Sequence, residues 1–265
     1  MDRKWSKQIK PKPQPLRPIF QEVAAEGYDM IEWRSPTSHG ITVPEMDLMA
    51  NPGQAEEIRN LSEEFGLELA YHAPQGPLWE FGALPFRDAV SQLRECIRRS
   101  SSINASIMTF HLGIADDGQR LDTIRQGAKV VDEVTSYATD YNVWLCVENV
   151  FEGDRCSVAN AGEFEILFGA SKSPRLRFTL DTGHANLYGV VYDLIESFPE
   201  KLFFTHLHDN NGVRDEHLVP GHGVIDWRRL LSCFDDADYS GPFNFELREE
   251  CELPELIHII GRYSC

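Results

Sequence analysis

The chain has 265 residues, 42% of them hydrophobic, and a formal net charge of −17. This length and apolar content suit one large domain with a full core, and the acidic balance argues against nucleic acid as the partner. No apolar run approaches the ~18 residues that a membrane span needs, and the polar start at residues 1–7 has no signal-peptide apolar stretch.

The six cysteines show no paired spacing of the kind that zinc or redox motifs have. Cys146 lies inside an apolar stretch, where a free thiol packs as a small hydrophobe. We therefore predict a reducing, cytoplasmic location rather than a secreted protein with disulfides.

Strand and helix patterns alternate along the chain. After a Pro- and Lys-rich segment with a possible first strand around residues 5–9, strands are predicted at 28–34, 67–74, 105–113, 143–149, 175–180, 201–209 and 241–247. Helices are predicted between and after them, at 18–27, 54–65, 86–101, 121–141, 157–170, 190–198, 227–234 and 256–263.

Eight strand–helix units of this size are typical of a (β/α)8 barrel, which uses roughly 30 residues per unit. We predict an α/β fold in which residues 1–265 form a single TIM-barrel domain, with residues 1–17 as the Pro/Lys-rich N-terminal segment. A doubly wound open sheet is the alternative. It would gather ligands from a few strands at one crevice, whereas nearly every strand here ends in a charged or imidazole side chain.

Carboxylates and imidazoles stand at the carboxyl ends of the predicted strands. They are His72, His111, Glu148, Asp181 with His184, His206 with His208, and Glu246. In a closed barrel these ends converge on one axial spot, where such a cluster repels itself unless a cation or protons compensate. Carboxylate ligands with one or two imidazoles suit Mn²⁺, Mg²⁺, Co²⁺ or Zn²⁺, so the pattern favours a metal site.

The two glutamates are the strongest of these candidates. Glu148 follows Trp-Leu-Cys-Val and Glu246 follows Phe-Asn-Phe, so both are drawn toward buried positions, where carboxylates are rare unless paired or metal-bound. A single strand-end histidine is more often a hydrogen-bonding cap than a ligand. Asp181, followed closely by a glycine, would by itself pass for a turn residue. His206 and His208 share one face of a strand, and only one of them need be a ligand.

Seven motifs together resemble the xylose-isomerase-like, apurinic-endonuclease-type barrel superfamily, from about Phe20 to the C-terminus. They are His72-Ala-Pro, Phe110-His-Leu-Gly, Val147-Glu-Asn, Leu180-Asp-Thr-Gly-His, His206-Leu-His-Asp, Asp215-Glu-His-Leu-Val-Pro-Gly-His-Gly and Phe245-Glu.

The resemblance to the isomerases and epimerases of this superfamily implies one divalent metal ion. Its implied ligands are Glu148, Asp181, His206 and Glu246. The resemblance also implies that Glu148 and Glu246 exchange the substrate proton, through an enediolate, and that His184 contacts the substrate. We assign substrate binding to His72, His111 and His208 as well. The predicted function is a metal-dependent isomerase or epimerase of a sugar, keto-sugar or inosose-like polyol. Homo-oligomers are common in the superfamily, so the resemblance is compatible with either a monomer or a homo-oligomer.

Two other functions compete with this prediction. An apurinic/apyrimidinic endonuclease-type phosphodiesterase has a trinuclear zinc site. The ligands that it would add are all present: His72, His111, His184, Asp215 and His217. The other competing function is a barrel that binds a polyol without converting it, and the intact Glu148 and Glu246 argue against this function. Trp33, Trp79 and Phe81 either stack on a sugar or pack in the core.

Overall fold

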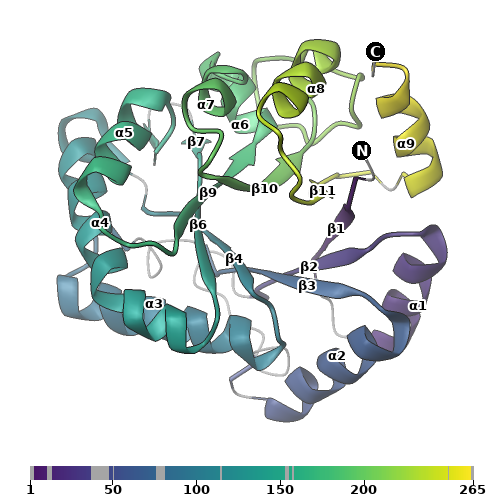
Figure 1. The fold of residues 1–265 in the computed structure, drawn as a ribbon, viewed down its shortest axis with the longest axis horizontal. Helices are drawn as coiled ribbons and strands as arrows, with labels where there is room; N and C mark the ends of the chain where they lie inside the picture. The colour runs from purple at the N-terminus through teal and green to yellow at the C-terminus, as the bar shows by residue number, and fades with distance from the viewer. Residues whose placement is uncertain are drawn as a thin grey trace.

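In the computed structural model, eight parallel strands close into a ring that helices surround (Figure 1). The structure describes residues 3–10, 14–36, 48–49, 51–75, 81–113, 115–152, 155–156, 158–249 and 251–263, with backbone alone at 116–117, 152 and 155–156. The barrel strands are β1 (Trp5–Ile9), β2 (Met30–Arg34), β3 (Glu68–His72), β4 (Ile107–Phe110), β6 (Trp144–Glu148), β9 (Leu176–Asp181), β10 (Leu202–Leu207) and β11 (Phe243–Phe245).

The ring order is β1-β11-β10-β9-β6-β4-β3-β2, so sequential strands are neighbours and β1 closes the ring against both β2 and β11. The predicted (β/α)8 barrel is therefore confirmed, including its first strand. The helices are α1 (Leu16–Glu26), α2 (Pro52–Phe65), α3 (Phe86–Ser102), α4 (Asp117–Asp140), α5 (Ala161–Ala170), α6 (Thr182–Tyr188), α7 (Asp193–Ser197), α8 (Trp227–Asp236) and α9 (Leu253–Gly261).

Two apolar clusters divide the interior. The larger one lies between the strands and the helices and includes Phe20, Leu93, Phe164 and Trp227. The smaller one consists of Met30, Ala70, Ile107, Cys146 and Phe204. Side chains two apart on a strand share a face, so these five residues point the same way as the polar residues further along their strands. They form an apolar layer inside the barrel, beneath the polar strand ends.

Three local features differ from the sequence predictions. Helix α5 begins after Asn160, whose side chain accepts a hydrogen bond from the Glu163 amide, and not at Ser157, which lies outside the described residues. A helix, α6, directly follows β9 and is capped by Asp181, which by its sequence alone would pass for a turn residue. A small antiparallel sheet of β5 (Ala115–Asp116), β8 (Arg155–Cys156) and β7 (Phe151–Glu152) stands beside the barrel. Such short elements carry too few residues to show a period.

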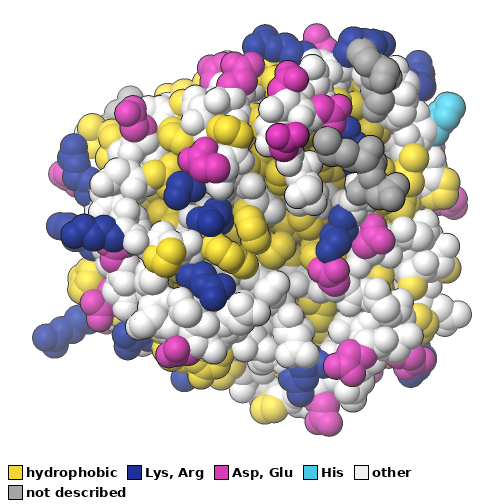
Figure 2. Space-filling model, viewed as in Figure 1, with side chains coloured by type: hydrophobic (Ala, Val, Ile, Leu, Met, Phe, Trp, Pro, Cys, Tyr) yellow, Lys and Arg dark blue, Asp and Glu magenta, His cyan; other side chains and the backbone are white. Residues whose placement is uncertain are grey.

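Acidic and basic side chains are interspersed on the face of the molecule shown in Figure 2, around a more apolar middle. Cys96, Cys146, Cys233 and Cys251 are buried, and none of these four thiols forms a disulfide. Within the part of the chain that the structure describes, no helix combines the length and apolar character needed to cross a membrane.

Candidate metal and active site

Four strand ends bring the predicted metal ligands together. Glu148 ends β6, Asp181 ends β9, His206 lies on β10, and Glu246 follows β11; their exposed fractions are 1%, 0%, 0% and 5%. The Nδ1 atom of His206 lies 3.3 Å from Glu246 Oε2, 3.4 Å from Glu148 Oε1 and 3.9 Å from Asp181 Oδ2. Three carboxylates from three different strands therefore surround one imidazole nitrogen.

That nitrogen is buried and has no hydrogen-bond partner among the described residues. An unpaired buried polar atom is costly, and three facing carboxylates repel one another unless positive charge lies between them. Three oxygens and one imidazole nitrogen form a donor set that suits a divalent cation. The residues present therefore fit the metal ion that the sequence predicted.

Glu148 is at the centre of a ring of imidazoles. Its Oε2 lies 3.1 Å from Nε2 of His72 and 3.1 Å from Nε2 of His111, and its Oε1 lies 3.4 Å from Nδ1 of His184. Burial raises the pKa of Glu148, but the His111 and His206 imidazoles outweigh it and hold that pKa well below its usual value. Glu148 is therefore ionised across the neutral range.

The histidines around the carboxylates differ in charge. Burial lowers the pKa of His184, while Asp181 and Glu148 raise it more strongly, to about 10. Burial also lowers the pKa of His206, but the carboxylates of Glu32 and Glu148 outweigh this effect and raise that pKa well above its usual value. Burial lowers the pKa of His111 by more than the Glu148 carboxylate raises it, so this pKa lies below its usual value. In the metal-free protein at neutral pH, His184 and His206 are therefore cationic and His111 is neutral.

His208 lies fully buried against Asp181. Its Nε2 is 3.0 Å and 3.1 Å from the two Asp181 oxygens, and its ring stacks on that of His217 with centroids 4.1 Å apart. Gly183 lies against the same ring, because a Cβ at this position would stand 1.9 Å from His208 Cε1. The glycine after Asp181 is thus required by close packing and lies inside α6. Asp181 is the cap of that helix and accepts a hydrogen bond from the His184 amide.

Asp209 organises the loop between β10 and α8. Its carboxylate accepts hydrogen bonds from the amides of Asn210, Gly221 and Ile225 and from Trp227 Nε1, at 2.8–3.2 Å. This anchored loop carries Asp215 and His217 to the site, where their side chains pair at 2.7 Å. Burial raises the pKa of Asp215, but the hydrogen bond from His217 and the charge of His184 lower it to about 2.

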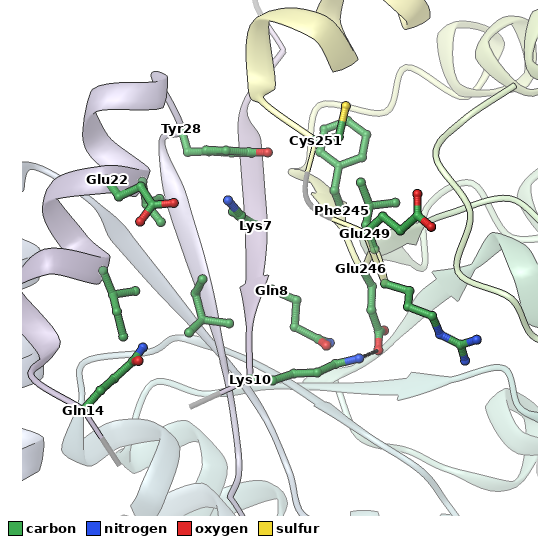
Figure 3. A pocket seen from close by; sticks show the side chains of 15 residues that line it. Lys7, Gln8, Lys10, Gln14, Glu22, Tyr28, Phe245, Glu246, Glu249 and Cys251 are labelled. Atoms are coloured by element: carbon green, nitrogen blue, oxygen red, sulfur yellow. Dashed lines mark ion pairs between the residues drawn. The ribbon is translucent and has the colours of Figure 1, made fainter. Parts of the chain in front are cut away.

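Arg34, at the end of β2, links the two sides of the site. Its guanidinium donates to Glu246 Oε1 at 2.9 Å and to Gln75 Oε1 at 2.5 Å. The Gln75 amide nitrogen lies 2.9 Å from Nε2 of His111. Lys10 Nζ also pairs with Glu246 Oε1, at 3.5 Å, at the edge of a cavity of about 300 Å³ between β1, α1 and the segment after β11 (Figure 3).

The predicted site residues are thus gathered at one end of the barrel, and their individual roles stay predictions. Residues beside them that were assigned no role from the sequence include Gln8, Glu32, Arg34, Gln75 and Asn244. A signal for Glu32 was present, because it is a carboxylate in the apolar stretch Met-Ile-Glu-Trp, as Glu148 is in its own strand. Trp33 and Phe81 are fully buried core residues, and Trp79 lies outside the described residues.

Comparison with known proteins agrees with this architecture. A family model described as xylose isomerase-like TIM barrel matches residues 20–260. The chain belongs to this family. Among solved structures of the same fold, a D-tagatose 3-epimerase-like protein aligns with a TM-score of 0.80 at 19% identity, covering 98% of this chain and 96% of that chain.

Relatives identified by sequence comparison include one named as an epimerase and one named as an endonuclease. The fructoselysine 3-epimerase of Shigella flexneri is 22% identical over 242 residues, which cover 88% of this chain and 85% of the relative. The probable endonuclease 4 of Mycoplasma capricolum subsp. capricolum is 25% identical over 211 residues, which cover 71% of this chain and 70% of the relative. The names of these two relatives thus correspond to the two enzyme activities weighed from the sequence.

Proposed function

We propose that this protein is a divalent-metal-dependent isomerase or epimerase of a sugar, keto-sugar or inosose-like polyol. The observation that carries the proposal is the unpaired Nδ1 of His206, which faces the carboxylates of Glu148, Asp181 and Glu246. A single cation among these four groups compensates both the unpaired nitrogen and the repulsion of the carboxylates.

The cation in this proposal is one Mn²⁺, Mg²⁺, Co²⁺ or Zn²⁺ held by Glu148, Asp181, His206 and Glu246. When bound, it supplies positive charge beside the substrate oxygens and so favours negative charge that develops there. Its binding requires His206 to be neutral at Nδ1, so the proton that raises the charge of the metal-free site leaves on binding.

Glu148 and Glu246 carry the proton transfer. Glu148 ends β6 and Glu246 follows β11, and these strands lie on different sides of β10 in the ring. In this proposal the substrate binds between the two glutamates and meets one carboxylate on each face. One glutamate removes the proton next to the substrate carbonyl, and an enediolate results. The other glutamate returns a proton to the opposite face for epimerisation or to the neighbouring carbon for isomerisation.

The surrounding histidines bind and orient the substrate in this proposal. His184, whose Nδ1 lies 3.4 Å from Glu148 Oε1, donates a hydrogen bond to a substrate oxygen that gains negative charge. His72 and His111 orient Glu148 and contact hydroxyls, and His208 fixes Asp181 through the contact at 3.0 Å. The names of the relatives, a fructoselysine 3-epimerase and a D-tagatose 3-epimerase-like protein, support a ketose as substrate.

An endonuclease-type trinuclear zinc enzyme is the second candidate, and one observation favours it. Beyond the Asp181, His206 and Glu246 group, ligand atoms within 4.8 Å of one another occur in His72–His111–Glu148 and in His208–Asp215–His217. The related probable endonuclease 4 supports the same candidate. The net charge of −17 argues against it, because phosphate backbones are bound by basic surfaces.

Metal content and hydrogen exchange separate the two candidates. The purified chain is loaded with Mn²⁺, Co²⁺ or Zn²⁺, and bound metal is counted while ketoses and inososes are screened in D₂O for loss of carbon-bound hydrogen. We expect one exchangeable ion per chain and deuterium at the carbon next to the carbonyl of at least one ketose. Three tightly held zinc ions per chain, with cleavage of abasic DNA and no exchange in any sugar, would overturn the proposal.

A further inference from the structure

Glu32 is a carboxylate inside the barrel that neither the metal ligands nor the proposed proton transfer uses. It lies on β2 with 0% of its surface exposed, directly beside His206. Its Oε1 is 3.0 Å from Nε2 of His206, and its Oε2 is 2.9 Å from the amide nitrogens of both Gln8 and Asn244. Each oxygen of this buried carboxylate therefore has a hydrogen-bond donor.

The two amides are held in one orientation. The Asn244 Oδ1 atom accepts a hydrogen bond from Ser6 Oγ at 2.8 Å, which turns the amide nitrogen of Asn244 toward Glu32. The Gln8 Oε1 atom accepts from Arg34 at 3.3 Å, with the same result. Glu32 Oε2 thus faces two donors whose orientation other contacts determine, and only an acceptor satisfies both.

When His206 is neutral, as binding of a cation requires, the contact at Oε1 decides which of its two nitrogens keeps the hydrogen. An ionised carboxylate only accepts hydrogen bonds, so Nε2 of His206 must be the donor. A neutral imidazole protonated on Nε2 has its lone pair on Nδ1, the atom that faces Glu148, Asp181 and Glu246. Pairing of a ligand imidazole with a carboxylate on its far side also raises the basicity of the ligating nitrogen.

We infer that Glu32 is a positioning residue, which holds His206 with its proton on Nε2 so that Nδ1 is free to bind the cation. The inference rests on the proposed metal site and adds to it the residue that selects the ligating atom. Ser6, Gln8 and Asn244 are the support that holds Glu32 as the acceptor. The apolar layer of Met30 and Phe204 lies on the same strands beneath it, away from the strand ends.

The isosteric variant Glu32→Gln tests this directly. Gln8 and Asn244 would still donate, so the new amide oxygen turns toward them and its NH₂ group turns toward His206 Nε2. The neutral imidazole must then accept at Nε2 and carry its proton on Nδ1, where the cation binds. We expect affinity for Co²⁺, measured by competition with a chelator, to fall ~10–100-fold, the range seen when such outer partners of ligating histidines are changed.

Glu163→Gln is the matched control, because Glu163 is also a buried carboxylate but binds the Ala159 amide and Arg120 on α4. The control should bind Co²⁺ as the wild type does. A second measurement uses the wild type alone: ¹⁵N NMR of the Zn²⁺-loaded chain should show His206 coordinated through Nδ1 and protonated on Nε2. This measurement decides the question even if Glu32→Gln fails to fold.

Unchanged Co²⁺ affinity in folded Glu32→Gln, coordination through Nε2, or a wild type that binds no divalent cation would each overturn the inference. Because these readouts do not depend on turnover, they separate the inference from the epimerase proposal. A wild-type chain that binds Co²⁺ through His206 Nδ1 but exchanges no sugar hydrogen would refute the epimerase and support the role of Glu32.

Discussion

Replacement of Glu148 by glutamine is the most informative single change in this site. The amide keeps the size of the side chain but removes the charge that faces Nε2 of His72 and His111 at 3.1 Å and Nδ1 of His184 and His206 at 3.4 Å. It also removes one proposed proton acceptor. The variant therefore separates the chemical role of Glu148 from its role in packing.

The expected loss of rate in Glu148→Gln follows from the proposed role of Glu148 as a general base. Positioned general bases contribute typically ~10²–10⁴-fold to rate, so the barrier to proton removal should rise by about 3–5 kcal/mol. Exchange of the substrate hydrogen with D₂O should fall by the same factor, measured at Mn²⁺ concentrations that saturate the variant. Glu163→Gln, an equal change in a buried carboxylate of α5, should keep the wild-type rate.

The same variant has a second readout that is independent of substrate. Glu148 is one of the charges that raise the pKa of His184 and His206, so its neutralisation should lower both pKa values in the metal-free protein. NMR titration of the histidine side chains measures this shift. Wild-type exchange rates in folded, metal-saturated Glu148→Gln would refute the assignment of Glu148 to proton transfer, and unchanged histidine pKa values would refute the electrostatic reasoning.

Three further predictions concern the supports of the site. Asp209→Asn should destabilise the fold by about 1–3 kcal/mol in urea unfolding, since either amide orientation leaves at least one buried N–H donor unpaired, with the Trp227 indole left unpaired in the milder case; unchanged stability would contradict this. Gly183→Ala should cost about 1–3 kcal/mol because its methyl group meets the His208 ring, whereas Gly169→Ala, with open space around it, should stabilise by up to about 1 kcal/mol; equal melting temperatures for the two variants would rule out the packing argument. The raised pKa of His184, about 10, makes its contribution to metal-free stability complete below pH ~6.5 and lost as pH rises toward 10. Unfolding in chelator between pH 6.5 and 9.5 should show this decline, and a stability that rises with pH would contradict it.

The cavity beside Glu246 and the pair of cations on that carboxylate distinguish the two glutamates. Glu246 Oε1 is bound by Arg34 and by Lys10, and the Lys10 pair is drawn in Figure 3. Both oxygens of Glu148 face imidazoles instead. Burial raises the pKa of Glu246, but His206 and Arg34 outweigh it and keep that pKa well below its usual value. The two carboxylates are thus held ionised by different partners, one by histidines and one mainly by a histidine and an arginine.

Much of this site was accessible from the sequence because a parallel barrel places all its strand ends at one rim. Each strand of buried apolar residues that ended in a carboxylate or imidazole predicted a position on that rim, and Glu148, Asp181, His206 and Glu246 followed from this pattern together with the family motifs. Element boundaries were less accurate, and the short helix α6 was missed, since seven residues carry little periodic signal.

What the sequence determined by itself was local: the alternation of strands and helices, the polar residue at each strand end, and the acidic balance of the chain. Only the tertiary structure decided which atoms meet. Gln8 on β1 and Glu32 on β2 meet His206 on β10 and Asn244 on β11 in one buried network, although Glu32 and His206 are 174 positions apart along the chain. The direction in which His206 presents its lone pair depends on that network, because the tautomer of an imidazole is set by the hydrogen bond on its far side, and that partner comes from a distant strand.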